Sequence, residues 1–147
     1  MNFSKLYNHA LRIVIQAHEG QKDKSGREYV THPIRVAERC NNPSAKIVAL
    51  LHDTIEDTNV TPDYLLNQGI PPNIIDGVLS VTRQEGESYE DFIKRAYENR
   101  YGREVKRADL EDNMDIRRLK EITDDDVVRL RKYLKAWQYL NDDGFVW

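Results

Sequence analysis

The segment from Leu51 to Asp57, LHDTIED, constrains the fold more than any other part of the sequence. It follows an apolar run, Ile47 to Leu51, on a predicted helix that is apolar nearly all round and is therefore expected to be central. Ionisable side chains then stand close together at His52, Asp53, Glu56 and Asp57. Such groups at the end of a buried helix are expensive unless a partner compensates their charge, and a cation is the simplest partner.

Helical spacing sharpens this prediction. His52 and Glu56 are four residues apart, as are Asp53 and Asp57, so a helix stacks the two pairs along adjacent lines of one surface. His52 and Asp53 can then reach one metal ion, with Glu56 and Asp57 one turn further on as an outer acid and base pair. The spacing alone also fits a solvated acidic face with a hydrogen-bonded histidine. Other residues have to decide between the two.

The remaining sequence predicts further helices and no sheet beyond short pieces. A first helix is expected from Ser4 to Glu19, and others are expected to begin with His32 or Ser44 as the cap residue. Further helices are expected to begin at Thr61-Pro62, after Pro71-Pro72, at a capping box from Ser88 to Asp91, and at Thr123 with Asp126. A long helical stretch is also expected after Gly102, from Val105 to Leu119. We therefore expect one all-α domain covering residues 1–147.

Composition excludes several classes of function. The formal net charge of −3 gives no global positive field, so nucleic acid is not expected as a partner. The single cysteine, Cys40, excludes an intramolecular disulfide and fits a reducing compartment. No apolar run is long enough to cross a bilayer, and the first residues do not resemble a signal peptide. We expect a cytoplasmic protein without a membrane partner, and a homo-oligomer remains open.

Several short motifs follow one another along the chain in a specific order. They are Ala17-His18-Glu19-Gly20-Gln21, Lys24-Ser25-Gly26, Tyr29-Val30-Thr31-His32-Pro33, Val36-Ala37, Ala49 to Thr58, Val81-Thr82-Arg83, Ala108-Asp109 and Asn113-Met114. In this order they resemble the hydrolase domain of RelA/SpoT-type HD enzymes, in particular its small stand-alone members. Those enzymes degrade guanosine tetraphosphate (ppGpp), the bacterial alarmone of the stringent response. The resemblance covers residues 17 to 114 and implies an HD-type helical bundle.

The resemblance also implies a metal site. The family's metal ligands fall on His32, His52, Asp53 and Asp109 of this sequence. Two imidazoles with two carboxylates suit Mn²⁺ or another divalent cation and leave coordination positions for water and a phosphate oxygen. Zinc is less favoured, because no thiolate is supplied.

Further site residues follow from the same resemblance. Glu56 and Asp57 match the acidic pair that positions and deprotonates the attacking water. Asn113 matches an asparagine that contacts the substrate's ribose or phosphate. Three other matches, Lys24, Ser25 and Tyr29, line the nucleotide pocket. The implied reaction is hydrolysis of ppGpp, or a close relative, to GDP and pyrophosphate.

Two departures from the family pattern leave base recognition open. Asp23 stands where an arginine commonly stacks on guanine, and Leu110-Glu111-Asp112 replaces the usual Arg-Leu-His. Another phosphorylated nucleotide is therefore an alternative substrate. A metal-containing, nucleotide-binding regulator without turnover is a second alternative. The basic residues near Asp109, a group that includes Lys106, give that region a positive bias useful for a polyphosphate, but most of them are expected to be ordinary solvated charges.

Overall fold

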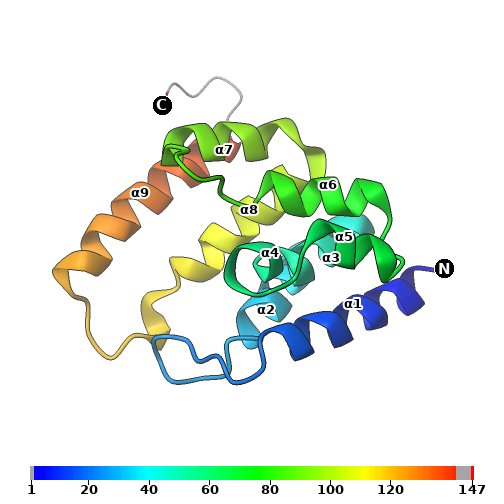
Figure 1. The fold of residues 1–147 in the computed structure, drawn as a ribbon. Helices are drawn as coiled ribbons and strands as arrows, with labels where there is room; N and C mark the ends of the chain where they lie inside the picture. The colour runs from blue at the N-terminus through cyan, green and yellow to red at the C-terminus, as the bar shows by residue number, and fades with distance from the viewer. Residues whose placement is uncertain (1, 142–146) are drawn as a thin grey trace.

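The chain folds as a bundle of α-helices, as a computed structural model shows for residues 2–141 and 147 (Figure 1). Within this described part, the extended pairing is confined to one isolated bridge between Lys22 and Glu28. The all-α prediction is therefore confirmed. None of the described helices is both long and apolar enough to cross a membrane.

The helices follow one another with short connections. In chain order they are α1 (Phe3–Ala17), α2 (Thr31–Arg39), α3 (Pro43–Leu51), α4 (Thr54–Asp57), α5 (Pro62–Asn67), α6 (Pro72–Ser80), α7 (Tyr89–Glu98), α8 (Arg100–Asn113), the 3₁₀ turn η1 (Ile116–Arg118) and α9 (Asp124–Asn141).

Helix α3 lies at the centre of the main hydrophobic core. Its residues Ile47 to Leu51 are at most 2% exposed, and it contacts α1, α2, α6 and α8. Burial of this second half of the helix on all sides explains why the sequence from Ile47 to Leu51 contains no polar residue. The central position expected from the sequence is confirmed.

Several predicted helix starts are confirmed and two are corrected. Thr61, Ser88 and Thr123 each accept a hydrogen bond from a backbone amide in the first turn that follows. The predicted cap Ser44 is wrong, because the Asn42 side chain accepts from the amides of Ser44 and Ala45. The predicted cap His32 is also wrong, since α2 already begins at Thr31 and His32 lies in its first turn.

Two predicted continuous helices are interrupted. The helix through the acidic segment ends at Leu51, and His52 and Asp53 form a turn before the short α4. The helix through Asp109 ends at Asn113, short of the predicted Leu119. It begins at Arg100, because the side chain of Asn99 caps it. Both interruptions redirect charged side chains towards the site described below.

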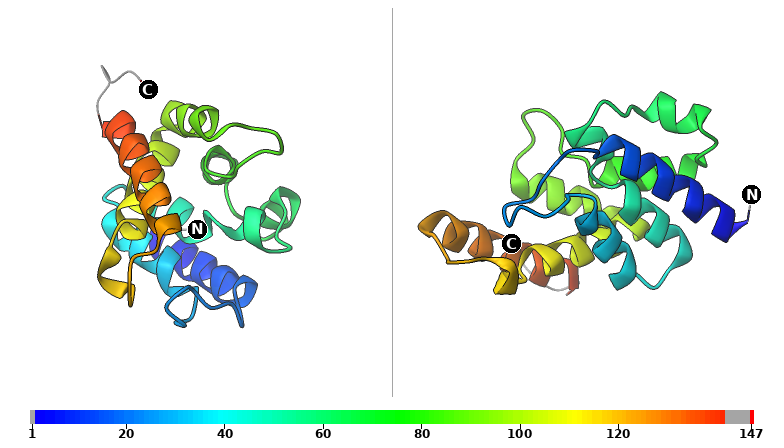
Figure 2. Two further views of the ribbon diagram at one scale, coloured as in Figure 1. Left: turned by 90° about the vertical axis from the view of Figure 1, so that its left-hand side faces the viewer. Right: turned by 90° about the horizontal axis from the view of Figure 1, so that it is seen from below.

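Helices α7, α8 and α9 enclose a second, smaller hydrophobic cluster. Its buried members are Ile93, Leu110, Ala136 and Leu140. Helix α9 packs mainly on α8 and runs along one flank, away from α1 and α5 (Figure 2). On the other side of α8, Gly102 permits close approach to α6, since a Cβ atom there would lie 2.0 Å from Ser80 Oγ. The expectation of one domain for residues 1–147 stays a prediction.

Candidate active site

Three buried side chains from different helices meet beside the core. His32 of α2, His52 at the end of α3 and Asp109 of α8 bring potential ligand atoms within 4.8 Å of one another. His32 Nε2 lies 2.9 Å from Asp109 Oδ1, and His52 Nε2 lies 3.4 Å from the same oxygen. Asp53 Oδ2 lies 3.1 Å from His52 Nε2 and 3.8 Å from His32 Nε2. The fold thus gathers all four residues that the sequence predicts as metal ligands.

The orientation of His52 suits a cation. Its Nδ1 atom lies 2.6 Å from the carbonyl oxygen of Ala49, and because a carbonyl only accepts, Nδ1 carries the proton. Its Nε2 atom is buried and makes no hydrogen bond within the described part of the chain. In neutral His52 this nitrogen turns a lone pair towards the carboxylates of Asp53 and Asp109, at 3.1 and 3.4 Å, which is repulsive unless a proton or a cation lies between them. A bound divalent cation would satisfy it, so the donor set fits a metal.

The electrostatics of the cluster lead to the same conclusion. Burial alone would lower the pKa of His52, but the carboxylates of Asp53 and Asp109 outweigh burial and raise that pKa well above its usual value. Burial alone would raise the pKa of Asp109, but Lys106 and the two histidines lower it well below its usual value. The site therefore favours ionised carboxylates that attract positive charge.

A second acidic group lies next to the first. Carboxylate oxygens of Asp53, Glu56 and Asp57 lie within 4.8 Å of one another. Burial, with the charges of Asp53 and Glu56, raises the pKa of Asp57 to about 6. The predicted stacking of His52 above Glu56 is wrong, because the turn at His52 and Asp53 interrupts the helix and His52 joins His32 and Asp109 instead. The carboxylate of Glu56 accepts a hydrogen bond of 2.7 Å from the backbone amide of Arg83.

A cavity of about 460 Å³ opens beside these carboxylates. Its lining includes the four residues that the sequence predicts as substrate contacts, namely Lys24, Ser25, Tyr29 and Asn113. Two of them also touch predicted ligands, since the Tyr29 hydroxyl donates to Asp53 Oδ2 and Asn113 Nδ2 donates to Asp109 Oδ1. Lys24 is exposed and its Nζ lies 3.8 Å from Asp126 Oδ1.

Asp23 closes the loop that carries Lys24 and Ser25. Its Oδ1 atom accepts from the Ser25 amide at 2.9 Å, the Ser25 hydroxyl at 2.7 Å and the Arg27 amide at 3.0 Å. An aspartate bonding to amides two and four residues ahead is a common way to fix a turn. The residue that departs from the family pattern therefore shapes one wall of the cavity.

Both carboxylates and cations line the cavity. We call Asp53, Glu56, Asp57 and Asp109 its acidic end, and Lys106, Arg35, Arg118 and Arg129 its basic wall. Lys106 contributes to that wall and is an exception among the basic residues near Asp109, because its side chain is only 13% exposed and Nζ lies 2.9 Å from Asp109 Oδ2. The sequence contained a sign of this pairing, because Lys106 stands three residues before Asp109 and side chains three apart on a helix are neighbours. Further lining cations are Arg35, Arg118 and Arg129.

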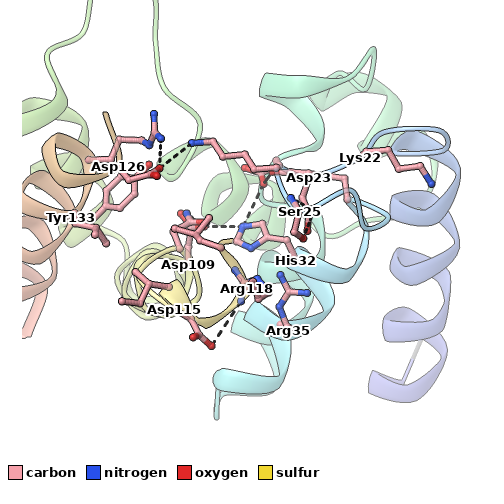
Figure 3. Close-up of a pocket in the computed structure, with 18 of the residues that line it drawn as sticks. Lys22, Asp23, Ser25, His32, Arg35, Asp109, Asp115, Arg118, Asp126 and Tyr133 are labelled. Carbon is pink, nitrogen blue, oxygen red and sulfur yellow. Dashed lines mark hydrogen bonds and ion pairs between the residues drawn. The ribbon is translucent and has the colours of Figure 1, made fainter. Parts of the chain in front are cut away.

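Sequence reasoning missed two other groups of residues. Asp112 is fully buried and contacts both His32 and Arg35, although it attracted notice only as a departure from the family pattern. The α9 residues Asp126, Arg129 and Tyr133 line the cavity (Figure 3). They lie beyond residue 114, where the resemblance ends, so no motif could identify them.

Sequence comparison relates part of the chain to proteins of ppGpp metabolism. It is 39% identical over 94 residues to the guanosine-3′,5′-bis(diphosphate) 3′-pyrophosphohydrolase of Haemophilus influenzae. Identity to the protein of that name from Borreliella burgdorferi is 38% over 78 residues. A GTP pyrophosphokinase of Streptomyces coelicolor is 45% identical over 53 residues. These stretches are 56%, 49% and 33% of this chain but only 14%, 12% and 6% of the relatives, and no protein-family model matches.

Structural comparison identifies the fold. The chain superposes on a metazoan orthologue of SpoT, described as hydrolysing ppGpp, with a TM-score of 0.72. The superposition covers 92% of this chain and 84% of the other, at 20% sequence identity. The two proteins share the HD-type helical fold, which confirms the expected architecture.

Proposed function

Since the chain has sequence relatives among RelA/SpoT proteins and the fold of a SpoT-type HD hydrolase, we propose that it is a metal-dependent phosphohydrolase acting on ppGpp or a close relative. The products would be GDP and pyrophosphate. Manganese is the cation that we propose, because two imidazoles and two carboxylates suit it. A small nucleotide is accordingly the proposed partner.

The convergence of His32, His52, Asp53 and Asp109 carries this proposal. These side chains come from α2, the end of α3 and α8, and three of them, His32, Asp53 and Asp109, line the cavity, with the buried His52 directly behind them. The unpaired Nε2 of His52 supports a bound cation there. A polyphosphate would be repelled by the carboxylates alone, so a cation is also needed to bring substrate and acidic group together.

The remaining residues fit a hydrolytic step. When bound, a divalent cation would lower the pKa of a coordinated water and offset charge on the phosphoryl oxygens. Glu56 and Asp57 lie beside Asp53 and are placed to hold that water and take a proton from it. The water oxygen bonds to the phosphorus that carries the 3′ oxygen of the ribose. The bond between this phosphorus and the 3′ oxygen breaks, pyrophosphate leaves with the water oxygen, and the 3′ oxygen takes up a proton. Lys106, Arg35 and Arg118 supply positive charge for the phosphates.

One observation favours the alternative of another phosphorylated nucleotide. The Asp23 carboxylate accepts hydrogen bonds from Ser25 and Arg27 within its own loop. Unlike an arginine at this position, it cannot stack a planar cation on a guanine ring. Selectivity for guanine would then depend on other cavity residues. The chemistry at phosphorus would be unchanged.

Substrate screening tests the proposal. Purified protein is incubated in Mn²⁺ with ppGpp and with a panel of other phosphorylated nucleotides, and pyrophosphate is resolved from orthophosphate. Pyrophosphate and GDP from ppGpp support the proposal. Turnover of another nucleotide alone supports the alternative substrate. Tight nucleotide binding in Mn²⁺ without any turnover would contradict hydrolysis and support a regulator.

A further inference from the structure

Asp112 is a buried carboxylate shared by several cations. It is 0% exposed and lies on α8, one turn after Asp109. Its Oδ2 atom lies 2.7 Å from Nδ1 of His32. Arg35 donates to both of its oxygens, from Nε to Oδ1 at 2.9 Å and from Nη2 to Oδ2 at 3.0 Å. Arg118 Nη2 lies 3.5 Å from Oδ2 and also donates to the Asp112 carbonyl oxygen at 2.9 Å.

The contact with His32 fixes which nitrogen faces the site. A carboxylate only accepts, so Nδ1 of His32 carries a proton and donates it to Asp112. The opposite nitrogen, Nε2, lies 2.9 Å from Asp109 Oδ1 and 3.8 Å from Asp53 Oδ2. With Nδ1 held by Asp112, Nε2 is the nitrogen that faces the site, where it donates to Asp109 Oδ1 and where a cation would replace its proton. A carboxylate behind a histidine also makes the imidazole a stronger ligand.

The contacts with the arginines hold the basic wall of the cavity. Arg35 and Arg118 both line the cavity, and both lie below His32 in Figure 3. Arg35 is held at its far end as well, since Nη1 donates to Thr31 Oγ1 at 2.9 Å. The two oxygens of Asp112 therefore restrain both arginines near the place where a nucleotide's phosphates would lie. A preorganised guanidinium loses less entropy when it binds phosphate.

We propose that Asp112 is a positioning residue that joins the metal site to the phosphate-binding wall. It orients His32 towards the cation, and with the same carboxylate it holds Arg35 and Arg118 against the substrate's phosphates. This inference rests on the proposed hydrolase function. Loss of Asp112 should therefore reduce metal affinity and substrate affinity together, although Asp112 is not among the residues that line the cavity.

A purely structural ion pair is the competing explanation. Buried ion pairs contribute little net stability, because desolvation offsets most of their attraction. A pair with Arg35 alone would also leave His32 free to adopt either tautomer. The observed carboxylate instead divides its oxygens between a predicted ligand and two cavity arginines.

Asp112→Asn tests the proposal with a matched control. With the amide oxygen in the place of Oδ2, the NH₂ group faces Nε of Arg35, and in the opposite orientation it faces Nδ1 of His32. One of these two donors therefore loses its acceptor in either orientation, and the negative charge that both of them contact is removed. The control is Asp115→Asn, three residues further along the chain. Asp115 also pairs with Arg118 and lines the cavity, but it forms no hydrogen bond or ion pair with His32 within the described part of the chain. Circular dichroism confirms folding of each variant. Mn²⁺ affinity is measured by electron paramagnetic resonance of free Mn²⁺, and KM and kcat are measured separately.

The expected result for Asp112→Asn is an Mn²⁺ dissociation constant about 10- to 100-fold higher, as for other partners of metal-bound histidines. KM for ppGpp should rise at saturating Mn²⁺. Asp115→Asn should keep Mn²⁺ affinity within about threefold of wild type, because it leaves the histidine contact in place. Wild-type Mn²⁺ affinity in folded Asp112→Asn, with the wild type active, would overturn this inference alone. Absence of Mn²⁺ binding by the wild type would overturn the proposed function.

Arg35→Gln keeps the inference testable if Asp112→Asn does not fold. It leaves the contact between Asp112 and His32 intact, so Mn²⁺ affinity should stay within about threefold of wild type. KM should rise about tenfold or more, the size expected for one charge-assisted hydrogen bond to phosphate. An unchanged KM in this variant would contradict the arginine half of the proposal.

Discussion

His32 Nε2 and Asp109 Oδ1 lie 2.9 Å apart, although 77 residues separate them in the chain. They meet because α2 and α8 both pack on the buried α3. The site is therefore a product of tertiary packing, and a ligand bound there binds only the folded chain.

Mn²⁺ should accordingly raise the melting temperature of the wild type, and Asp53→Ala should abolish this rise together with activity. Binding at 100 times the dissociation constant stabilises a fold by about 2.7 kcal/mol. Differential scanning calorimetry with and without chelator measures the effect. Asp63→Ala, on the exposed side of α5, is the control and should keep the full shift. Full turnover and a full shift in Asp53→Ala would show that the metal assignment is wrong.

Glu56→Gln should retain Mn²⁺ and lose most of its rate. The amide oxygen can still accept from the Arg83 amide, so the local fold is kept, whereas proton transfer is impaired. A fall in kcat of about 100-fold or more is expected if Glu56 assists that transfer. Metal content by mass spectrometry and single-turnover rates separate the two effects. Loss of metal from this variant would mean that Glu56 is itself a ligand.

Asp57 should titrate with a pKa of about 6 in the metal-free protein, because burial and the charges of Asp53 and Glu56 oppose its ionisation. Carboxyl carbon NMR measures this pKa directly. Asp53→Asn removes a neighbouring negative charge and should lower it. A midpoint near the value of about 3.9 for a free aspartate would contradict the crowding of carboxylates.

The same raised pKa has a defined sign for stability. The unfolded chain ionises Asp57 near pH 3.9, whereas the folded chain resists ionisation up to about pH 6, so this group lowers stability as pH rises through that window. Metal-free Asp57→Asn should therefore melt at a higher temperature than the wild type at pH 7. The difference should disappear near pH 4.

Asp23→Arg should raise KM for ppGpp. An arginine could stack on a purine, but it removes three hydrogen bonds that fix Ser25 and Arg27, each worth about 0.5 to 1.5 kcal/mol. Asp23→Asn keeps an acceptor oxygen and should stay close to wild type. A lower KM in Asp23→Arg would show that stacking on the base outweighs the order of the loop.

Gly102→Ala should destabilise the fold by about 1 to 3 kcal/mol, the usual range for overpacking. Its Cβ would lie 2.0 Å from Ser80 Oγ and 3.2 Å from the Ala96 carbonyl oxygen. Urea unfolding measures the loss. Adding Ser80→Ala to this variant should restore part of the stability. If the double variant is no more stable than Gly102→Ala, the contact with Ser80 Oγ is not the cause of the loss.

Periodicity predicted the helical class and the central position of α3, because apolar residues at every position leave no solvated face. It could not predict the turn at His52 and Asp53. Both residues tolerate helical geometry, and only the positions of His32 and Asp109, far away in sequence, make a turn favourable. The acidic segment was therefore identified correctly, and Asp53 does lie beside Asp57, whereas the predicted pairing of His52 with Glu56 was wrong.

The candidate ligands came from motif order, and the structure brings all four together. Asp112 was not predicted, because a buried aspartate on a helix looks like any polar helix residue until its partners His32 and Arg35 are located. The cavity residues of α9 were not predicted for a different reason. Their sequence has no motif, and only the packing of α9 on α8 brings them to the cavity.

The separation of α9 from the main core has a consequence for evolution. The predicted ligands are anchored on helices of the central core, whereas Arg129 and Tyr133 belong to a helix that packs on its own small cluster. Substitutions on the cavity side of α9 can accumulate without disturbing the packing that positions the histidines. For the hydrolase proposed above, this arrangement would allow lineages that share the fold to diverge in the nucleotide they select while keeping the same reaction chemistry.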